Sequence, residues 1–223
     1  MHFFLCLTHE PTERFIRNEN HSARKKGKVN HVKQQLKSSE YTLKPSEIKK
    51  IIYSTKTFRD RCLIEALYYA GLRRFEAQNL DVRDIDFERK RITVRRGKGE
   101  KVRVIPILND GFLSDLRHLT RDRTQGYVFL STRNNKLSLR AINKIVAGGG
   151  RLAQVQNPDP ARKKINPHLF RHSIARHLKD QGFSVEFVQK FLGHESFKTT
   201  MDMYGTLSID DMQEMVERKM TPD

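Results

Sequence analysis

Two short segments in which apolar and polar residues alternate lie on either side of a glycine turn near the middle of the chain. The first covers residues 91–95, the turn holds Gly97-Lys98-Gly99, and the second covers residues 101–107. Alternation with a period of two places successive side chains on opposite faces of an extended strand. Two such segments joined by a short turn that contains glycine predict an antiparallel β-hairpin.

Helical signals surround this hairpin on both sides. Apolar residues recur there at steps of three and four positions, which places them on one face of a helix. Helical segments are predicted in this way near Pro45, Leu63, Arg73, Leu137, His168 and Val185. A last helix is predicted from Ser208, a suitable N-cap, to Met220. The expected fold class is therefore α+β, mostly helical with one small antiparallel β-sheet.

Glycines set the expected ends of two of these helices. Gly71 follows an apolar helical segment and is expected to terminate it. Three consecutive glycines at positions 148–150 have low helix propensity, so we expect them to break the helix that begins near Leu137. Residues 127–130 are a candidate for a third, short strand.

The charge of the chain is far from balanced. Lysine and arginine together number 43 and aspartate and glutamate 26, which gives a formal net charge of +17. A surface this positive attracts polyanions, and nucleic acid releases condensed counterions when a cationic protein binds it. Nucleic acid is thus the favoured partner, although a basic housekeeping protein has the same balance. A membrane is not an expected partner, because no basic amphipathic helix stands beside an apolar anchor.

Residues 1–40 differ in composition from the rest of the chain. No acidic residue lies between His21 and Ser39, and no apolar period is sustained there. The basic residues of this stretch include Arg24, Lys25, Lys26 and Lys28. The composition predicts a basic N-terminal arm or linker, followed by a globular domain over residues 41–223. The arm either contacts DNA through these side chains or is a solvated tail without a role.

The ends and the cysteines point to an ordinary cytoplasmic protein. Residues 1–7 are apolar, but the segment is too short for a signal peptide or a membrane span. The two cysteines, Cys6 and Cys62, form no metal-binding pattern and make only a weak case for a disulfide. Because Cys62 lies in an apolar run, we expect it to be a reduced core residue.

Five separated segments place polar residues at helix ends or at a turn. They are Gly71-Leu72-Arg73-x-x-Glu76, Gly97-Lys98-Gly99, His168-x-x-Arg171-His172, Leu192-Gly193-His194, and Thr199-Thr200 followed by Tyr204. His168 and Arg171 are spaced i and i+3, so both side chains can reach one anion from the same helix face. Each segment alone also has a structural interpretation, for example a salt-bridged helix start at Arg73 and an exposed turn lysine at Lys98.

Zinc binding is the other chemistry to consider for the histidines. His168 and His172 have the i, i+4 spacing that helical zinc ligands use. No third ligand accompanies them in the sequence, so we expect no metal site. His172 and His177 are instead interpreted as structural residues.

The order and spacing of the five segments resemble those of the tyrosine recombinase, or phage integrase, family. The likeness extends from about Leu43 to Thr206. It implies the catalytic-domain fold of that family and a set of catalytic residues, which correspond here to Arg73, Lys98, His168, Arg171, His194 and the nucleophile Tyr204. Glu76 corresponds to the acidic residue that supports the first arginine.

The resemblance also implies a function and partners. The expected activity is that of a site-specific DNA recombinase or integrase of a mobile element, which cleaves and rejoins DNA through a 3′-phosphotyrosine. Such a reaction retains the bond energy and uses arginines in place of a metal, so no ATP, Mg²⁺ or other cofactor is expected. The expected partners are double-stranded DNA and further copies of the chain, as a tetramer on DNA. An accessory DNA-bending protein is a further candidate.

These residue types suit the attack of a phenol on a phosphodiester. Negative charge develops on the non-bridging oxygens, and arginines bind such oxygens with planar donors that keep their charge. A tyrosine hydroxyl has a pKa of about 10 and needs a base or a polar field. His168 is the candidate that accepts its proton. Lys98 is the candidate acid for the leaving 5′-oxygen, and His194 is a candidate hydrogen-bond donor to the phosphate.

Two features depart from the family pattern. About forty residues precede Tyr41, which are too few for the N-terminal core-binding domain of the family, so we expect the arm to be truncated. Tyr204 follows Thr200 by four residues, whereas many relatives have a spacing of three. Two other functions therefore stay open, a catalytically idle DNA-binding remnant of an integrase and a nicking-closing enzyme similar to type IB topoisomerases.

Overall fold

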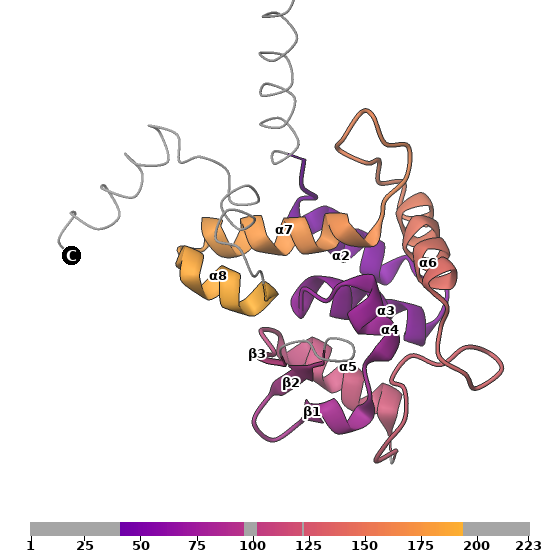
Figure 1. Cartoon of the computed structure of the whole chain (residues 1–223). Helices are drawn as coiled ribbons and strands as arrows, with labels where there is room; N and C mark the ends of the chain where they lie inside the picture. The colour runs from indigo at the N-terminus through magenta and orange to yellow at the C-terminus, as the bar shows by residue number, and fades with distance from the viewer. Residues whose placement is uncertain (1–40, 96–101, 122, 194–223) are drawn as a thin grey trace, which may run out of the picture. The chain divides into compact units, whose positions relative to one another are not determined.

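The structure is a computed structural model, and it describes residues 41–95, 102–121 and 123–193. The predicted helix at 208–220 lies outside this part of the chain. Figure 1 shows a predominantly helical arrangement with a small sheet at one side. Among the described residues, no helix has the length and apolar character needed to cross a membrane.

Helices carry most of the described chain. They are α2 (Pro45–Tyr53), α3 (Phe58–Tyr69), α4 (Arg74–Asn79), α5 (Asp110–Thr120), α6 (Leu139–Leu152), α7 (Pro167–Asp180) and α8 (Val185–Leu192). Side chains of Thr57, Asn109, Ser138, Asn166 and Ser184 cap the N-termini of α3, α5, α6, α7 and α8. Each cap accepts a hydrogen bond from the backbone N–H three residues later, which satisfies a donor that the helix itself leaves unpaired.

The sheet contains the predicted hairpin. Strands β2 (Arg91–Val94) and β3 (Arg103–Pro106) pair antiparallel, with Ile92 opposite Ile105. Both isoleucines are fully buried, whereas Val104, whose side chain lies on the other face of β3, is exposed. The fold class, α+β with one small antiparallel sheet, is confirmed.

The third strand is not the predicted segment. Strand β1 (Ile85–Asp86) pairs with the free edge of β2 after the 3₁₀ turn Val82–Asp84. Residues 127–130 form only isolated bridges, one at each end of the segment. Val128 and Phe129 are buried in the core. The segment therefore contributes apolar side chains rather than a continuous ladder, which explains its strand-like composition.

The predicted break at the three glycines is wrong. Helix α6 runs through positions 148–150 and ends at Leu152. A Cβ at Gly150 would lie 2.5 Å from the side chain of Ile165, and one at Gly149 would lie 3.1 Å from Ile64. These two glycines allow other elements to approach the helix closely. Packing thus compensates for the low helix propensity of glycine, which is only a weak local preference.

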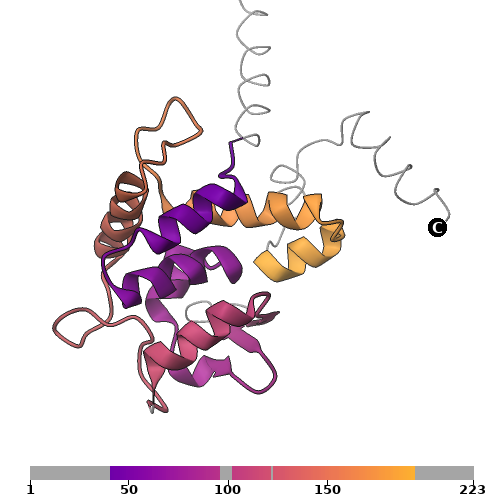
Figure 2. The same ribbon diagram turned by 180° about the vertical axis from the view of Figure 1, so that it is seen from behind.

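Helix α3 lies at the centre of the core. Cys62, Leu63, Ile64 and Leu67 are all fully buried, and α3 packs against α2, α5 and α7. Figure 2 shows the molecule from behind, and in that view α2 and α5 lie toward the viewer. Cys62 is a free, buried thiol, in agreement with the sequence prediction. Because the core fixes α3, it also fixes the turn that follows it, where the candidate site begins.

Candidate active site

The carboxylate of Glu76 is the centre of a cluster of arginines. Its side chain is only 3% exposed, and the guanidinium groups of Arg73, Arg103 and Arg171 lie within ion-pair distance of its oxygens. Arg73 precedes α4, Arg103 is on β3, and Arg171 is on α7. The fold thus brings together charged groups from three separate segments, with three positive charges around one negative charge.

Arg73 is the most exposed member of this cluster, with 33% of its side chain accessible. Its Nη1 donates to Glu76 Oε1 at 2.9 Å, and its backbone N–H donates to Oε2 at 2.8 Å. The second contact caps helix α4 and confirms the salt-bridged helix start. Its Nη2 lies 3.4 Å from the carbonyl oxygen of Gly193, a long hydrogen bond. Arg73 is therefore held mainly through one side of its guanidinium.

Arg103 is a member of the cluster that the sequence analysis missed. Its Nη1 and Nη2 donate to the two oxygens of Glu76 at 2.7 and 2.9 Å, which is a bidentate pair. Its Nε donates to the carbonyl oxygen of Phe191 at 3.2 Å. A signal for it was present, because alternation along β3 places Arg103 on the same face as the buried Ile105. A charged residue at an inward strand position needs a partner.

Arg171 is buried under the cluster. Its Nη1 donates to the carbonyl oxygen of Gly71 at 2.5 Å, and its Nη2 donates to that of Leu192. Its Nη1 also lies 3.9 Å from Glu76 Oε2. Arg171 therefore joins the end of α8 to the turn between α3 and α4, and it adds a positive charge beneath Arg73.

The electrostatics of the cluster favour an ionised Glu76. Burial alone would raise the pKa of this carboxyl, but hydrogen bonds and charge from Arg103, with the charge of Arg171, lower it to about 2. The carboxylate is thus ionised at neutral pH, and the three arginines exceed it by two positive charges. Such a cluster suits a doubly or singly charged anion.

His168 lies one helical turn before Arg171 on α7 and is partly exposed to solvent. Partial burial lowers the pKa of its imidazole, and the charges of Arg74, Arg171 and Arg73 lower it further. The structure thus places His168 in the field of the same cations. The lowered pKa favours the neutral imidazole, which is the form that can accept a proton.

The two other histidines of α7 have different surroundings. Burial is the main reason why the pKa of His172 falls to about 4. The Nδ1 of His177 lies 2.7 Å from the hydroxyl oxygen of Tyr68, which connects α7 to α3. Burial raises the pKa of Tyr68. These contacts fit the structural interpretation of His177, and they make Tyr68 a poor nucleophile.

Several predicted site residues lie outside the described part of the chain. These are Lys98, His194, Tyr204 and the basic residues Arg24, Lys25, Lys26 and Lys28. Their proposed roles therefore stay predictions. The described residues Arg95 and Val102 flank the segment that holds Lys98, and Gly193 directly precedes His194.

One group in the described part of the chain has the composition of a metal site. Ligand atoms of Cys62, Glu65 and Asp115 lie within 4.8 Å of one another. However, Arg61 pairs with both carboxylates, through Nε at 3.1 Å from Glu65 and Nη2 at 2.5 Å from Asp115. Burial also raises the pKa of the Cys62 thiol, so the thiolate that a metal needs is disfavoured. We assign this group to the packing of α3 against α5.

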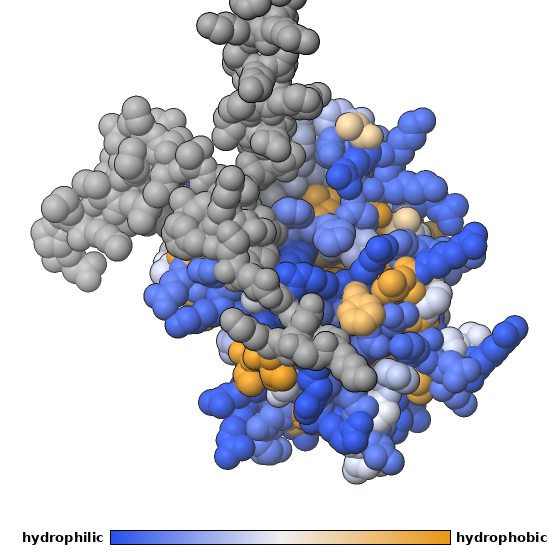
Figure 3. Space-filling view, in the orientation of Figure 1, coloured by the Kyte–Doolittle hydropathy of each residue, from blue (hydrophilic) through white to orange (hydrophobic). Residues whose placement is uncertain are grey.

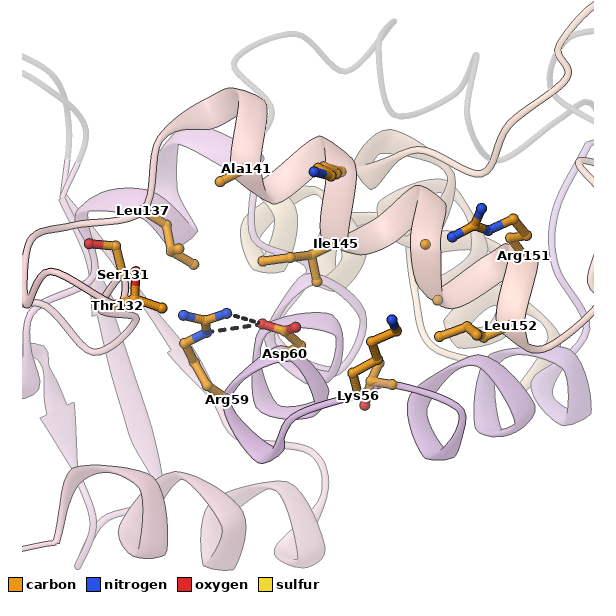
Figure 4. A pocket seen from close by; sticks show the side chains of 14 residues that line it. Lys56, Arg59, Asp60, Ser131, Thr132, Leu137, Ala141, Ile145, Arg151 and Leu152 are labelled. Carbon is orange, nitrogen blue, oxygen red and sulfur yellow. Dashed lines mark hydrogen bonds and ion pairs between the residues drawn. The ribbon is translucent and has the colours of Figure 1, made fainter.

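A pocket of about 410 Å³ lies between α6, the α2–α3 connection and residues 131–132 (Figure 4). Its lining includes four basic residues, Lys56, Arg59, Lys144 and Arg151. Arg59 is already bound, to Asp60 and to the carbonyl oxygen of Leu130. The pocket contains none of the predicted catalytic residues. The face of the molecule drawn in Figure 3 is mostly hydrophilic outside the grey atoms, with a few hydrophobic patches.

Comparison with known proteins identifies one family. The sequence matches the phage integrase family over residues 41–208. It is 36% identical to the tyrosine recombinase XerA of Pyrococcus furiosus over 184 residues, which cover 79% of this chain and 61% of the relative. It is 31% identical to the tyrosine recombinase XerC of Syntrophus aciditrophicus over 171 residues, which cover 72% of this chain and 53% of the relative.

Solved structures give the same result for the fold. The crystal structure of XerA recombinase matches with a TM-score of 0.66 and 28% identity, over 82% of this chain and 66% of that one. XerH recombinase in a post-cleavage complex with a palindromic difH substrate matches with a TM-score of 0.61 and 25% identity, over 80% of this chain and 52% of that one. The chain spans about three fifths of the length of the XerA relatives that it matches.

Proposed function

Because the chain belongs to the phage integrase family, we propose that it is a site-specific DNA recombinase that cleaves and rejoins DNA through a 3′-phosphotyrosine. The observation that carries the proposal is the arginine cluster at Glu76, since it combines a partly exposed guanidinium with an excess of positive charge. This arrangement suits a phosphodiester, whose non-bridging oxygens gain negative charge during displacement. The tyrosine recombinases similar to this chain support the same chemistry.

In this proposal, Arg73 contacts the scissile phosphate directly. Its Nη2 makes only a long hydrogen bond to Gly193, so a phosphate oxygen can replace this contact at little cost. Arg171 acts from below, where its buried charge strengthens the field and its contacts hold the ends of two helices together. Both arginines stay charged at any physiological pH.

The proton transfers are assigned from the motif and from the state of His168. Tyr204 attacks the phosphorus and forms the phosphotyrosine, while the 5′-oxygen of the DNA leaves. His168 takes the phenolic proton, which its lowered pKa allows at neutral pH. Lys98 protonates the leaving oxygen, and His194 donates a hydrogen bond to the phosphate. Religation by a 5′-hydroxyl reverses these steps, so no ATP is consumed.

The proposed partner is double-stranded DNA. The net charge of +17 favours a polyanion, and the similar XerH was solved in complex with a DNA substrate. We extend the proposal to a tetramer on DNA, an accessory DNA-bending protein, phosphate contacts from the basic arm and a cytoplasmic site of action. The relatives are longer than the matched region, so the DNA sites that they use are not transferred to this chain.

A plasmid assay tests this function. DNA from the flanks of the gene is cloned as two direct copies in a supercoiled plasmid and incubated with the full chain without metal ions. We expect two smaller circles, which only recombination between the two sites produces. Tyr204→Phe is the matched control and should yield no product. Relaxed plasmid without exchange would instead indicate a nicking-closing enzyme, and intact plasmid that still shifts on a gel would indicate a DNA-binding remnant.

A further inference from the structure

We infer that Arg103 is a positioning residue for the proposed cleavage reaction, because it holds Glu76 in the orientation that leaves Arg73 available to the phosphate. The inference rests on the proposed function and extends it to a residue outside the predicted catalytic set. Arg103 does not reach the substrate in this account. It acts through Glu76, and Glu76 in turn acts on Arg73.

The hydrogen bonds of Glu76 show how this works. Arg103 occupies both carboxylate oxygens, at 2.7 and 2.9 Å. The side chain of Arg73 donates to one oxygen at 2.9 Å, and its backbone N–H donates to the other. Two guanidinium groups therefore share one carboxylate unequally. Arg103 has the bidentate contact, and Arg73 has a single side-chain contact.

Removal of Arg103 would change this balance. An ionised carboxylate whose side chain is only 3% exposed needs charged donors, and among the described residues Arg73 and Arg171 are the other arginines that lie near it. Arg73 is the more exposed of the two and the one with room to move. It would then form the bidentate pair with Glu76 that Arg103 forms now. The donors of Arg73 that face the proposed phosphate would be withdrawn toward the carboxylate.

The same residue connects the elements that surround the site. Its Nε donates to the carbonyl oxygen of Phe191 near the end of α8, and its backbone lies in β3. In sequence, β3 follows the turn that holds Lys98, and α8 precedes His194. Arg103 thus fixes Glu76 relative to both elements. Its side chain is 10% exposed, so the contacts are shielded from solvent.

Lysine cannot reproduce this arrangement. A guanidinium presents paired donors in one plane, whereas an ammonium is a point charge that reaches one oxygen at a time. Arg103→Lys would keep the charge near Glu76 but lose the bidentate contact and the bond to Phe191. The comparison of lysine with an uncharged residue therefore separates the effect of charge from the effect of orientation.

The test measures cleavage and binding separately. Wild type, Arg103→Lys and Arg103→Met are mixed in excess with a nicked suicide substrate, and the single-turnover rate of covalent adduct formation is recorded. The affinity of each protein for the same DNA comes from gel shifts. We expect the rate to fall on the order of a hundredfold in Arg103→Met and on the order of tenfold or more in Arg103→Lys, with affinity changed less than about threefold.

Arg61→Met serves as the control for loss of a partly buried ion pair. Arg61 bridges Glu65 and Asp115 between α3 and α5, so its removal lowers stability without touching the cluster at Glu76. Thermal melts of all variants set a temperature at which each stays folded. There, Arg61→Met should cleave at the wild-type rate, although it melts earlier.

A second set of variants asks whether Arg103 acts through Glu76. The rate is measured for Glu76→Gln alone and together with Arg103→Met. We expect the double variant to cleave about as slowly as the slower single variant, because both changes break one chain of contacts. Independent, multiplied losses would contradict the inference. So would a full wild-type rate in Arg103→Lys or Arg103→Met. Failure of wild type to form any adduct would instead overturn the proposed function on which the inference rests.

Discussion

Gly71 lies directly against Leu192, because a Cβ at position 71 would approach Leu192 Cδ2 to 2.8 Å. The contact joins the turn after α3 to the end of α8. Arg171 binds the carbonyl oxygens of the same two residues. Gly71 also has a φ of 55°, in the left-handed region that favours glycine. The close approach and the backbone conformation therefore both require glycine next to Arg73.

Gly71→Ala should lower stability more than its backbone strain alone explains. Gly182→Ala is the matched control, since Gly182 also has a positive φ of 85° but nothing within 4 Å of an added Cβ. We expect about 1–2 kcal/mol of destabilisation in the control from the left-handed backbone. Gly71→Ala should lose distinctly more in urea unfolding and also slow adduct formation. Equal losses in the two variants would contradict the packing argument.

The glycines of α6 should respond in opposite directions. Gly148 has no atom within 4 Å of an added Cβ, so Gly148→Ala should gain up to about 1 kcal/mol from helix propensity. Gly150→Ala should be destabilised, because its Cβ would lie 2.5 Å from the side chain of Ile165. Thermal melts of the two variants check this. A loss in Gly148→Ala would show that the glycine has a role that the packing does not reveal.

The glycines at position 71 and in α6 show where prediction from sequence stops. Local patterns were sufficient for the β2–β3 hairpin and for most of the described helices, because periodicity reports which face is buried. Helix α5 (Asp110–Thr120) was not predicted. They were not sufficient for the continuation of α6 through Gly149 and Gly150, since that depends on the approach of Ile165 and Ile64 from distant segments. A propensity rule cannot contain such contacts.

In the candidate site, too, contacts between residues close in sequence could be predicted, whereas contacts between distant residues could not. Arg73 and Glu76 are three residues apart, so their pairing could be predicted from helix geometry, and His168 and Arg171 share a face for the same reason. Arg103 is 27 residues from Glu76, and only the fold brings them together. An inward-facing arginine on a short strand indicated a buried partner but not which one.

Glu65, which lies where α3 packs against α5, should make the free energy of unfolding depend on pH. Burial and the nearby Asp115 raise the pKa of this carboxyl from 4.5 to about 7. The folded state therefore favours the protonated form, and this contribution is fully present below pH 4.5 and lost as the pH rises through about 7. Glu65→Gln mimics the protonated form, so it should be more stable than wild type at pH 8 and similar at pH 5.

Urea unfolding at several pH values measures this difference. Glu186→Gln is the control, because Glu186 is an exposed residue whose pKa is lowered by Lys190. It should not become more stable than wild type at high pH. A Glu65→Gln protein that is less stable than wild type at both pH values would show that Glu65 is ionised in the native state.

His168 should set the acid limit of the proposed cleavage. Its pKa is lowered by burial and then by the charge of Arg74, so the imidazole can accept a proton at a lower pH than an ordinary histidine can. The single-turnover rate should therefore decline only at a pH below the ordinary pKa of a histidine. Arg74→Gln removes the strongest of the neighbouring charges, which should raise the pKa of His168 and move the decline to higher pH. An unchanged pH profile would count against His168 as the base.

The central claim is that Tyr204 becomes covalently attached to DNA. The most direct measurement is mass spectrometry of peptides from an adduct trapped on a nicked suicide substrate by the full chain. We predict a phosphonucleotide mass on the peptide that contains Tyr204, and no adduct in Tyr204→Phe. An adduct on another residue, or one that persists in Tyr204→Phe, would contradict the account.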